Sequence, residues 1–122
     1  MILVDTSSWI EAMRTRGNAA TRERMTFLVE TGQAAWCPAV RLELWAGVGD
    51  AHERKILTEF EQVIPEFDIT SETWDFACEL ASRGRKAGKT FPVSDLLIAA
   101  CARLNKVEVE SADAHFAVLM NL

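Results

Sequence analysis

The sequence predicts one α/β domain that covers residues 1–122 and contains a short, mainly parallel sheet. Two observations support this prediction. The length of 122 residues fits one domain, and the chain contains no repeat and no Pro/Gly/Ser-rich linker that would divide it. Short apolar segments also alternate with longer segments of helical periodicity, and this alternation is typical of parallel strands joined by helices.

The predicted strands are short and apolar, as is typical of strands that are buried on both faces. The first reads Ile-Leu-Val and is followed directly by Asp5. Pro38 ends the second, because proline cannot donate to a strand ladder. The four predicted strands comprise residues 2–4, 34–37, 67–69 and 107–109.

The segments between these strands have the capping residues and the apolar spacing of helices. In the segment 52–64, for example, the apolar residues repeat at helical spacing along one face, and Pro65 ends the pattern. Thr70 and Ser71 provide the cap for the next helix. The first predicted helix begins at a cap within residues 5–8 and ends at 17–18. The other predicted helices cover residues 21–30, 40–46, 52–64, 71 to 84 or 88, 95–105 and 113–119.

Composition excludes several classes of protein. The formal net charge is −5, which argues against a protein that holds nucleic acid by bulk positive charge, although a metal held by carboxylates can supply that charge locally. No apolar run approaches the roughly 18 residues that span a bilayer, and the N-terminus lacks the pattern of a secretory signal. The three cysteines have no metal-binding spacing. We therefore expect a reduced, cytoplasmic protein without a membrane segment.

Four acidic residues stand where a solvated surface does not explain them. Asp5 and Asp113 follow the first and last predicted strands, at their carboxyl ends. Glu43 lies in a helix that is apolar almost all round, and Asp95 precedes seven uncharged residues, LLIAACA. Because ligands of parallel α/β sheets gather beyond the carboxyl ends of the strands, we expect all four carboxylates at one edge of the sheet.

Each of these acids also has a structural explanation when it is taken alone. Asp5 and Asp113 fit helix N-caps, Asp95 suits the positive end of a helix dipole, and Glu43 can extend its carboxylate to solvent. Their convergence instead favours a metal site. Oxygen ligands without His or Cys select hard cations, here Mg²⁺ or Mn²⁺. A water activated by such a cation is a nucleophile suited to phosphodiester hydrolysis.

Four stretches of the chain form a series: ILVDTSSWIEAMR at the start, VRLELWAG in the middle, FPVSDLLIAACA later and SADAHF near the end. In their order and spacing they resemble the PIN-domain ribonucleases, and among these the VapC toxins of toxin–antitoxin pairs. The resemblance covers essentially the whole chain. It implies a three-layer α/β/α PIN-like domain and a Mg²⁺- or Mn²⁺-dependent endoribonuclease that hydrolyses RNA with a metal-activated water.

The resemblance also implies roles for particular residues and partners. Asp5, Glu43, Asp95 and Asp113 correspond to the acidic metal site of the family, and Ser7 to the hydroxyl that assists there. The implied partners are RNA, a VapB-type antitoxin and a second copy in a homodimer.

Two alternative functions remain open: a Mg²⁺-binding receiver-like domain and a catalytically inactive PIN-like interaction domain. A receiver requires an acidic pair after the first strand and a lysine after the last one, and the chain has neither. The presence of all four acids argues against the inactive domain.

Several other residues carry expectations of their own. Glu110 could be a fifth acid near the site or an outward-facing residue of the last strand, and the outward position is favoured. His115 is expected at an exposed turn or helix end, where a metal-dependent nuclease does not require it as an acid or base. Trp36 and Trp74 are expected in the core. Two basic clusters could contact RNA phosphates or could form ordinary solvated helix faces. They comprise Arg14, Arg16, Arg22 and Arg24, and Arg83, Arg85, Lys86 and Lys89.

Overall fold

A computed structural model describes residues 1–14 and 17–122, and its sheet is short and entirely parallel. The strands β1 (Ile2–Val4), β2 (Ala34–Ala35) and β3 (Glu108–Glu110) pair in the order β2-β1-β3. The register places Leu3 opposite Ala35 on one side and Val109 on the other. The carboxyl ends of β1 and β3 therefore lie next to each other, as the sequence predicts for the segments that carry Asp5 and Asp113.

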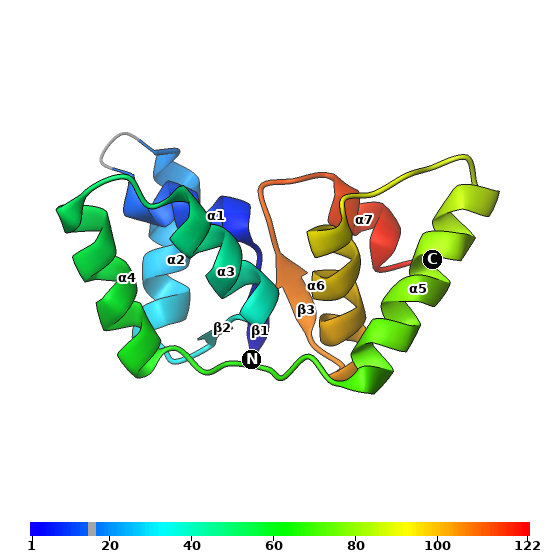
Figure 1. The fold of residues 1–122 in the computed structure, drawn as a ribbon. Helices are drawn as coiled ribbons and strands as arrows, with labels where there is room; N and C mark the ends of the chain where they lie inside the picture. Colours follow the sequence, from blue (N-terminus) through cyan, green and yellow to red (C-terminus); the bar gives the residue numbers. More distant parts are fainter. Residues whose placement is uncertain (15–16) are drawn as a thin grey trace.

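Helices surround this sheet on both sides. In chain order they are α1 (Thr6–Met13), α2 (Ala19–Glu30), α3 (Pro38–Gly47), α4 (Ala51–Val63), α5 (Ser71–Lys86), α6 (Val93–Leu104) and α7 (His115–Leu119). Figure 1 shows the sheet at the centre, with α1–α4 towards one end of the molecule and α5–α7 towards the other. The predicted α/β class with a short parallel sheet is confirmed. None of the described helices has the length and apolar character needed to cross a membrane.

The predicted strand at 67–69 is wrong. Just before this segment, Trp36 and Glu66 form a single parallel bridge. Trp36 N donates to Pro65 O, and Phe67 N donates to Trp36 O. The partner strand stops because Pro38 begins α3 immediately after Cys37, so no extended residues remain for a longer ladder. The apolar side chains of this segment pack against the core instead.

The first helix ends earlier than predicted. α1 stops at Met13, with Arg14 as its C-cap, rather than at 17–18. Asn18 has the opposite role: its side chain accepts a hydrogen bond from Thr21 N at 3.0 Å and begins α2. A residue that prefers turns was thus correctly located as a boundary, but it marks a start and not an end.

α6 is the most deeply buried helix among the described elements. Its residues from Asp95 to Ala102 are all buried, and the helix packs against α3, α5, α7 and β3. Trp36 lies in the core, 5.5 Å from the fully buried ring of Trp9. Trp74 does not, because its side chain is 52% exposed on α5, which contradicts the core position expected from sequence. The buried face of α6 places the first turn of this helix, which carries Asp95, against the carboxyl edge of the sheet.

Candidate metal centre

Asp5 links the end of β1 to the start of α1. Its backbone N donates to Glu110 O at 2.9 Å, which fixes the residue beside the end of β3, and its side chain is the N-cap of α1. The residue is only 4% exposed. Three donors converge on one carboxylate oxygen, Oδ2: Ser7 N at 3.4 Å, Ser7 Oγ at 2.8 Å and Ser111 Oγ at 2.8 Å. Within the described residues no hydrogen bond ends on Oδ1, so this oxygen is the one available to a ligand.

The two serines connect Asp5 to the loop after β3. Their hydroxyl oxygens lie 3.2 Å apart, and each also accepts a backbone hydrogen bond, Ser7 from Ala112 N at 3.1 Å and Ser111 from Asp113 N at 2.8 Å. The structure thus brings Ser7 to the site, as the family resemblance implies. Ser111 was missed as a site residue, although it begins the SADAHF stretch that carries part of that resemblance.

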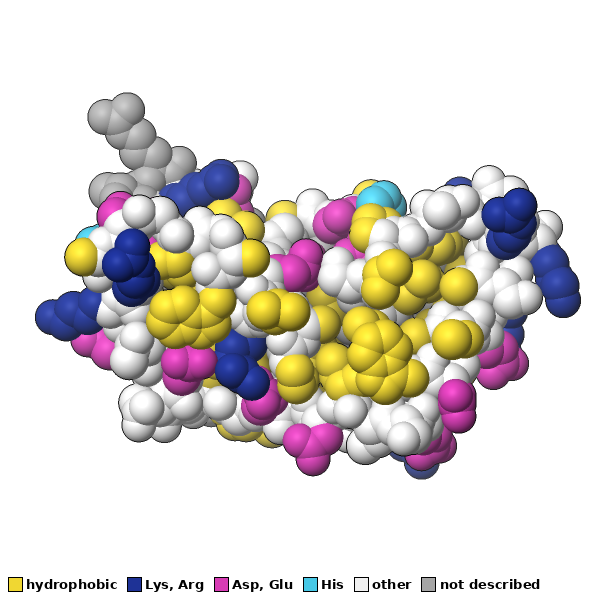
Figure 2. Space-filling model, in the orientation of Figure 1, with side chains coloured by type: hydrophobic (Ala, Val, Ile, Leu, Met, Phe, Trp, Pro, Cys, Tyr) yellow, Lys and Arg dark blue, Asp and Glu magenta, His cyan; other side chains and the backbone are white. Residues whose placement is uncertain are grey.

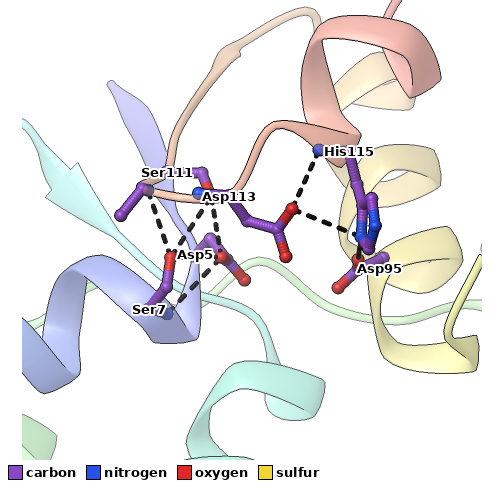
Figure 3. Close-up of polar contacts among 7 residues, drawn as sticks. Asp5, Ser7, Asp95, Ser111, Asp113 and His115 are labelled. Carbon is purple, nitrogen blue, oxygen red and sulfur yellow. Dashed lines mark hydrogen bonds and ion pairs between the residues drawn. The ribbon is translucent and has the colours of Figure 1, made fainter.

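Asp95, Asp113 and His115 form the second half of the site (Figure 3). His115 Nδ1 lies 2.7 Å from Asp95 Oδ2 and 3.3 Å from Asp113 Oδ1. Asp113 Oδ1 also accepts a hydrogen bond from His115 N at 2.9 Å, which closes the turn before α7. One ligand atom from each of the three residues lies within 4.8 Å of the others, so they could hold one metal ion together.

The charges of these groups influence one another. The pKa of Asp95 is raised, first by burial and then by the negative charges of Asp5 and Asp113, while the hydrogen bond from His115 opposes the rise. The pKa of His115 is raised in turn, mainly by its hydrogen bond to Asp95. Among the described residues, His115 is the basic side chain that pairs with Asp95 and Asp113, and Asp5 adds a third carboxylate nearby. This excess of negative charge, with oxygen and imidazole ligands in reach, fits a divalent cation.

Glu43 is close to this site but stands apart from the other acids. It lies on α3 and accepts a hydrogen bond from Thr6 Oγ1, at 2.8 Å, to its Oε1. Thr6 directly follows Asp5, so the carboxylate is held beside the first turn of α1. Among the described residues no hydrogen bond or ion pair joins Glu43 to the other three acids. Its role at the metal site stays a prediction.

Glu110 does not join the acidic cluster either. Its carboxylate forms an ion pair with Arg24 of α2 at 3.5 Å, which agrees with an outward-facing position on β3. His115 differs from its expectation in one respect. Its ring is 45% exposed, as expected for a helix end, but its Nδ1 points into the site.

Some arginines of the basic clusters have partners within the chain. Arg83 pairs with Glu79 and donates to the carbonyl of Leu122, and Arg14 pairs with Glu11. Arg16 lies outside the described residues. These contacts favour a structural role for the paired arginines, because their guanidinium groups already neutralise neighbouring acids.

With this geometry established, comparison with known proteins defines the family. The PIN domain model matches residues 2–120, and the chain belongs to the PIN domain family. It is 30% identical, along its whole length and 93% of theirs, to VapC ribonuclease Mb1587 of Mycobacterium bovis and to Ribonuclease VapC11 of Mycobacterium tuberculosis.

Solved structures show the same fold. VapBC2 from Rickettsia felis, bound to a promoter DNA fragment, superposes with a TM-score of 0.82 at 20% identity, covering 100% of this chain and 96% of that one. VapC20 of Mycobacterium tuberculosis, a toxin that cleaves the sarcin-ricin loop, superposes with a TM-score of 0.76 at 18% identity, covering 97% and 94%. The three-layer PIN-like architecture expected from the sequence motifs is confirmed.

Proposed function

We propose that this protein is an endoribonuclease, the toxin of a VapBC-type pair, and that it hydrolyses RNA phosphodiester bonds with Mg²⁺ or Mn²⁺. The observation that carries the proposal is the gathering of Asp5, Asp95 and Asp113 at the carboxyl edge of the parallel sheet. The two curated relatives support the proposal, because both match this chain along its whole length and both are VapC ribonucleases.

In this proposal the chain holds the cation through Asp95, Asp113 and the free Oδ1 of Asp5. When bound, the cation supplies Lewis-acid chemistry: it lowers the pKa of a water molecule and neutralises charge that develops on the phosphate. Ser7 and Ser111 keep Oδ2 of Asp5 occupied and so leave Oδ1 for the ion. A ligand set that is held before the cation arrives needs little rearrangement to bind it.

Glu43 completes the proposed machinery as a hydrogen-bond acceptor for the attacking water. Its hydrogen bond from Thr6 engages Oε1 and leaves Oε2 available. Because water attacks in place of the ribose 2′-hydroxyl, the products should carry 5′-phosphate and 3′-hydroxyl ends.

The proposed partners follow from the same relationship. VapBC2 of Rickettsia felis and a toxin–antitoxin complex from Klebsiella pneumoniae have the same fold. We expect a VapB-type antitoxin to bind this protein and silence it, and we expect the protein to act in the cytoplasm, where its RNA substrates are. A homodimer is also part of the proposal.

The direct test compares Asp95→Asn with Asp75→Asn, an exposed acid on α5 that serves as the control. Wild type and Asp75→Asn should cleave RNA with Mg²⁺ or Mn²⁺ and lose activity in EDTA. Asp95→Asn should cleave at least about a hundredfold more slowly, because it removes a negative charge from the cation site. Sequencing of the cleaved ends should find 5′-phosphates. Cleavage that persists in EDTA and leaves 2′,3′-cyclic phosphates would refute the mechanism. A folded wild type that cleaves no cellular RNA with either metal would favour the inactive interaction domain.

A further inference from the structure

The imidazole of His115 presents one defined nitrogen to the acidic site. Nδ1 faces Asp95 and Asp113, while the edge-on contact with Phe91, at 5.7 Å between ring centroids, sets the plane of the imidazole. Phe91 is itself held close to α5 at Gly84, where an added Cβ would lie 3.1 Å from the ring. The orientation of His115 is thus supported by packing as well as by its hydrogen bonds.

The distances suit a ligand as well as a hydrogen-bond donor. Adjacent ligand atoms of an octahedral ion with bonds of about 2.1 Å lie about 3 Å apart. His115 Nδ1 lies 2.7 Å from one carboxylate oxygen and 3.3 Å from the other, on either side of that value. The ligand atoms of Asp95, Asp113 and His115 all lie within 4.8 Å of one another, so the three atoms could share one ion.

We infer that His115 Nδ1 is a ligand of the cation beside Asp95 and Asp113, and that this nitrogen makes the site prefer Mn²⁺ over Mg²⁺. This inference rests on the proposed metal-dependent function. Mg²⁺ is bound almost entirely by oxygen, whereas imidazole suits transition metals. The sequence had indicated an oxygen-only site, because His115, although only two residues after Asp113, was expected at an exposed turn or helix end. The structure adds that nitrogen.

The test is a spectroscopic one and needs no activity. Mn²⁺ bound to the full chain is examined by electron spin echo envelope modulation, which detects nitrogen in direct contact with the ion. Wild type should show this nitrogen signal, and His115→Ala should lose it. His52→Ala is the matched control, since His52 is the other histidine of the chain and is exposed on α4. The control should keep the signal.

Competition between the metals gives a second readout. The concentration of Mg²⁺ that displaces half of the bound Mn²⁺ should fall at least about tenfold in His115→Ala, because only Mn²⁺ binding loses a favourable ligand. His115→Asn, which keeps more of the side-chain packing, should behave in the same way. Equal weakening of both metals by these variants would overturn the inference.

The outcomes separate this inference from the proposed function. Mn²⁺ binding that Asp95→Asn abolishes, but that shows no nitrogen signal in wild type, would overturn the role of His115 and leave the carboxylate site intact. The absence of any Asp95-dependent Mn²⁺ binding in wild type would overturn both.

Discussion

At the scale of single residues, the distribution of hydrogen bonds over the Asp5 carboxylate has a functional consequence. Oδ2 receives both serine hydroxyls, and Oδ1 is left for a ligand. Ser111 also accepts from Asp113 N, so one hydroxyl positions two of the acids. A small side chain can therefore hold two of the acids in position without being a ligand of the proposed site itself.

We predict that Ser111→Ala lowers the rate of RNA cleavage by roughly ten- to a hundredfold, because groups that orient metal ligands have effects of this size. The loss of the Ser111 hydroxyl leaves Asp113 N without its acceptor, which should destabilise the fold by only about 1 kcal/mol. The measurements are cleavage rates and urea unfolding. Ser82→Ala, an exposed serine of α5, should change neither. Wild-type cleavage by Ser111→Ala would show that Asp5 needs no such support.

The pH dependence of stability is a second prediction at this scale. The pKa values of His115 and Asp95 are both raised in the folded protein, so the folded state binds more protons than the unfolded state. The stabilisation from His115 is complete below its ordinary pKa of about 6.5 and is lost as the pH rises through the higher folded value. In EDTA the Tm should therefore fall as the pH rises above about 6.5.

His115→Asn should flatten this fall in Tm, and His52→Asn should not. The same titration predicts that Mn²⁺ binds more tightly as the pH rises over this range, since the proton on His115 competes with the ion. A Tm that is constant with pH in wild type, or an unchanged slope in His115→Asn, would contradict the assignment of this ion pair.

At the scale of elements, α6 and α5 form the support of the site: α6 carries Asp95, and α5 packs against α6. α6 is buried along most of its length, and α5 packs along it and carries Gly84 against Phe91. α5 begins with a capping box, in which Thr70 and Thr73 each accept a hydrogen bond from the backbone N of the other. These hydrogen bonds join Thr70 and Thr73 only to each other, so the stabilisation from the cap is separable from the chemistry of the acids.

We predict that Thr70→Ala lowers the free energy of unfolding by about 1 kcal/mol, the usual effect of losing a helix N-cap. The rate of RNA cleavage should not change, because Thr70 does not contact the acidic site. Thr58→Ala is the control, since Thr58 lies on the exposed face of α4 and alanine is a better helix former. Urea denaturation measures the free energy of unfolding of the two variants. An equal loss of stability in the two variants would argue against the capping box.

At the scale of the whole molecule, one face is unusually apolar. Figure 2 shows hydrophobic side chains gathered between α3 and α5. Leu42, Trp74 and Val93 are 70%, 52% and 68% exposed there, and they line a groove of about 520 Å³. Of the described residues that line the groove, only Glu43 is charged. Such a surface is suited to a second copy of the chain, which would also cover the tryptophan that sequence analysis had assigned to the core.

We predict that Leu42→Glu converts the expected homodimer into a monomer, because it places a charge in the middle of this face in each of two facing copies. Val63→Glu is the control, since Val63 is 68% exposed, close to the 70% of Leu42, but lies at the end of α4 and does not line the groove. Light scattering after size-exclusion chromatography measures the mass. A wild type that remains monomeric at high micromolar concentration would refute the dimer, and a dimer in both variants would place it on another face.

Much of the fold was predictable because its signals are local. The apolar segments and capping residues located each helix to within a few residues. Asn18 was correctly placed at a helix boundary, but it begins α2 and does not end α1. The segment 67–69 could not be assigned correctly in this way. Its apolar residues indicate burial, but whether they form a ladder depends on how far the partner segment remains extended, and Pro38 ends that segment early.

The sequence by itself determined the backbone position of the acidic site. Asp5 and Asp113 follow strands whose carboxyl ends must meet in any parallel sheet, and Asp95 begins the most apolar helix of the chain. Only the tertiary structure decided which other groups join them. Ser111 and His115 reach the acids because the turn before α7 aims their side chains inwards, and Glu43 is held by Thr6 instead. Those directions depend on loop conformation and on packing against distant residues such as Phe91, for which local sequence has no signal.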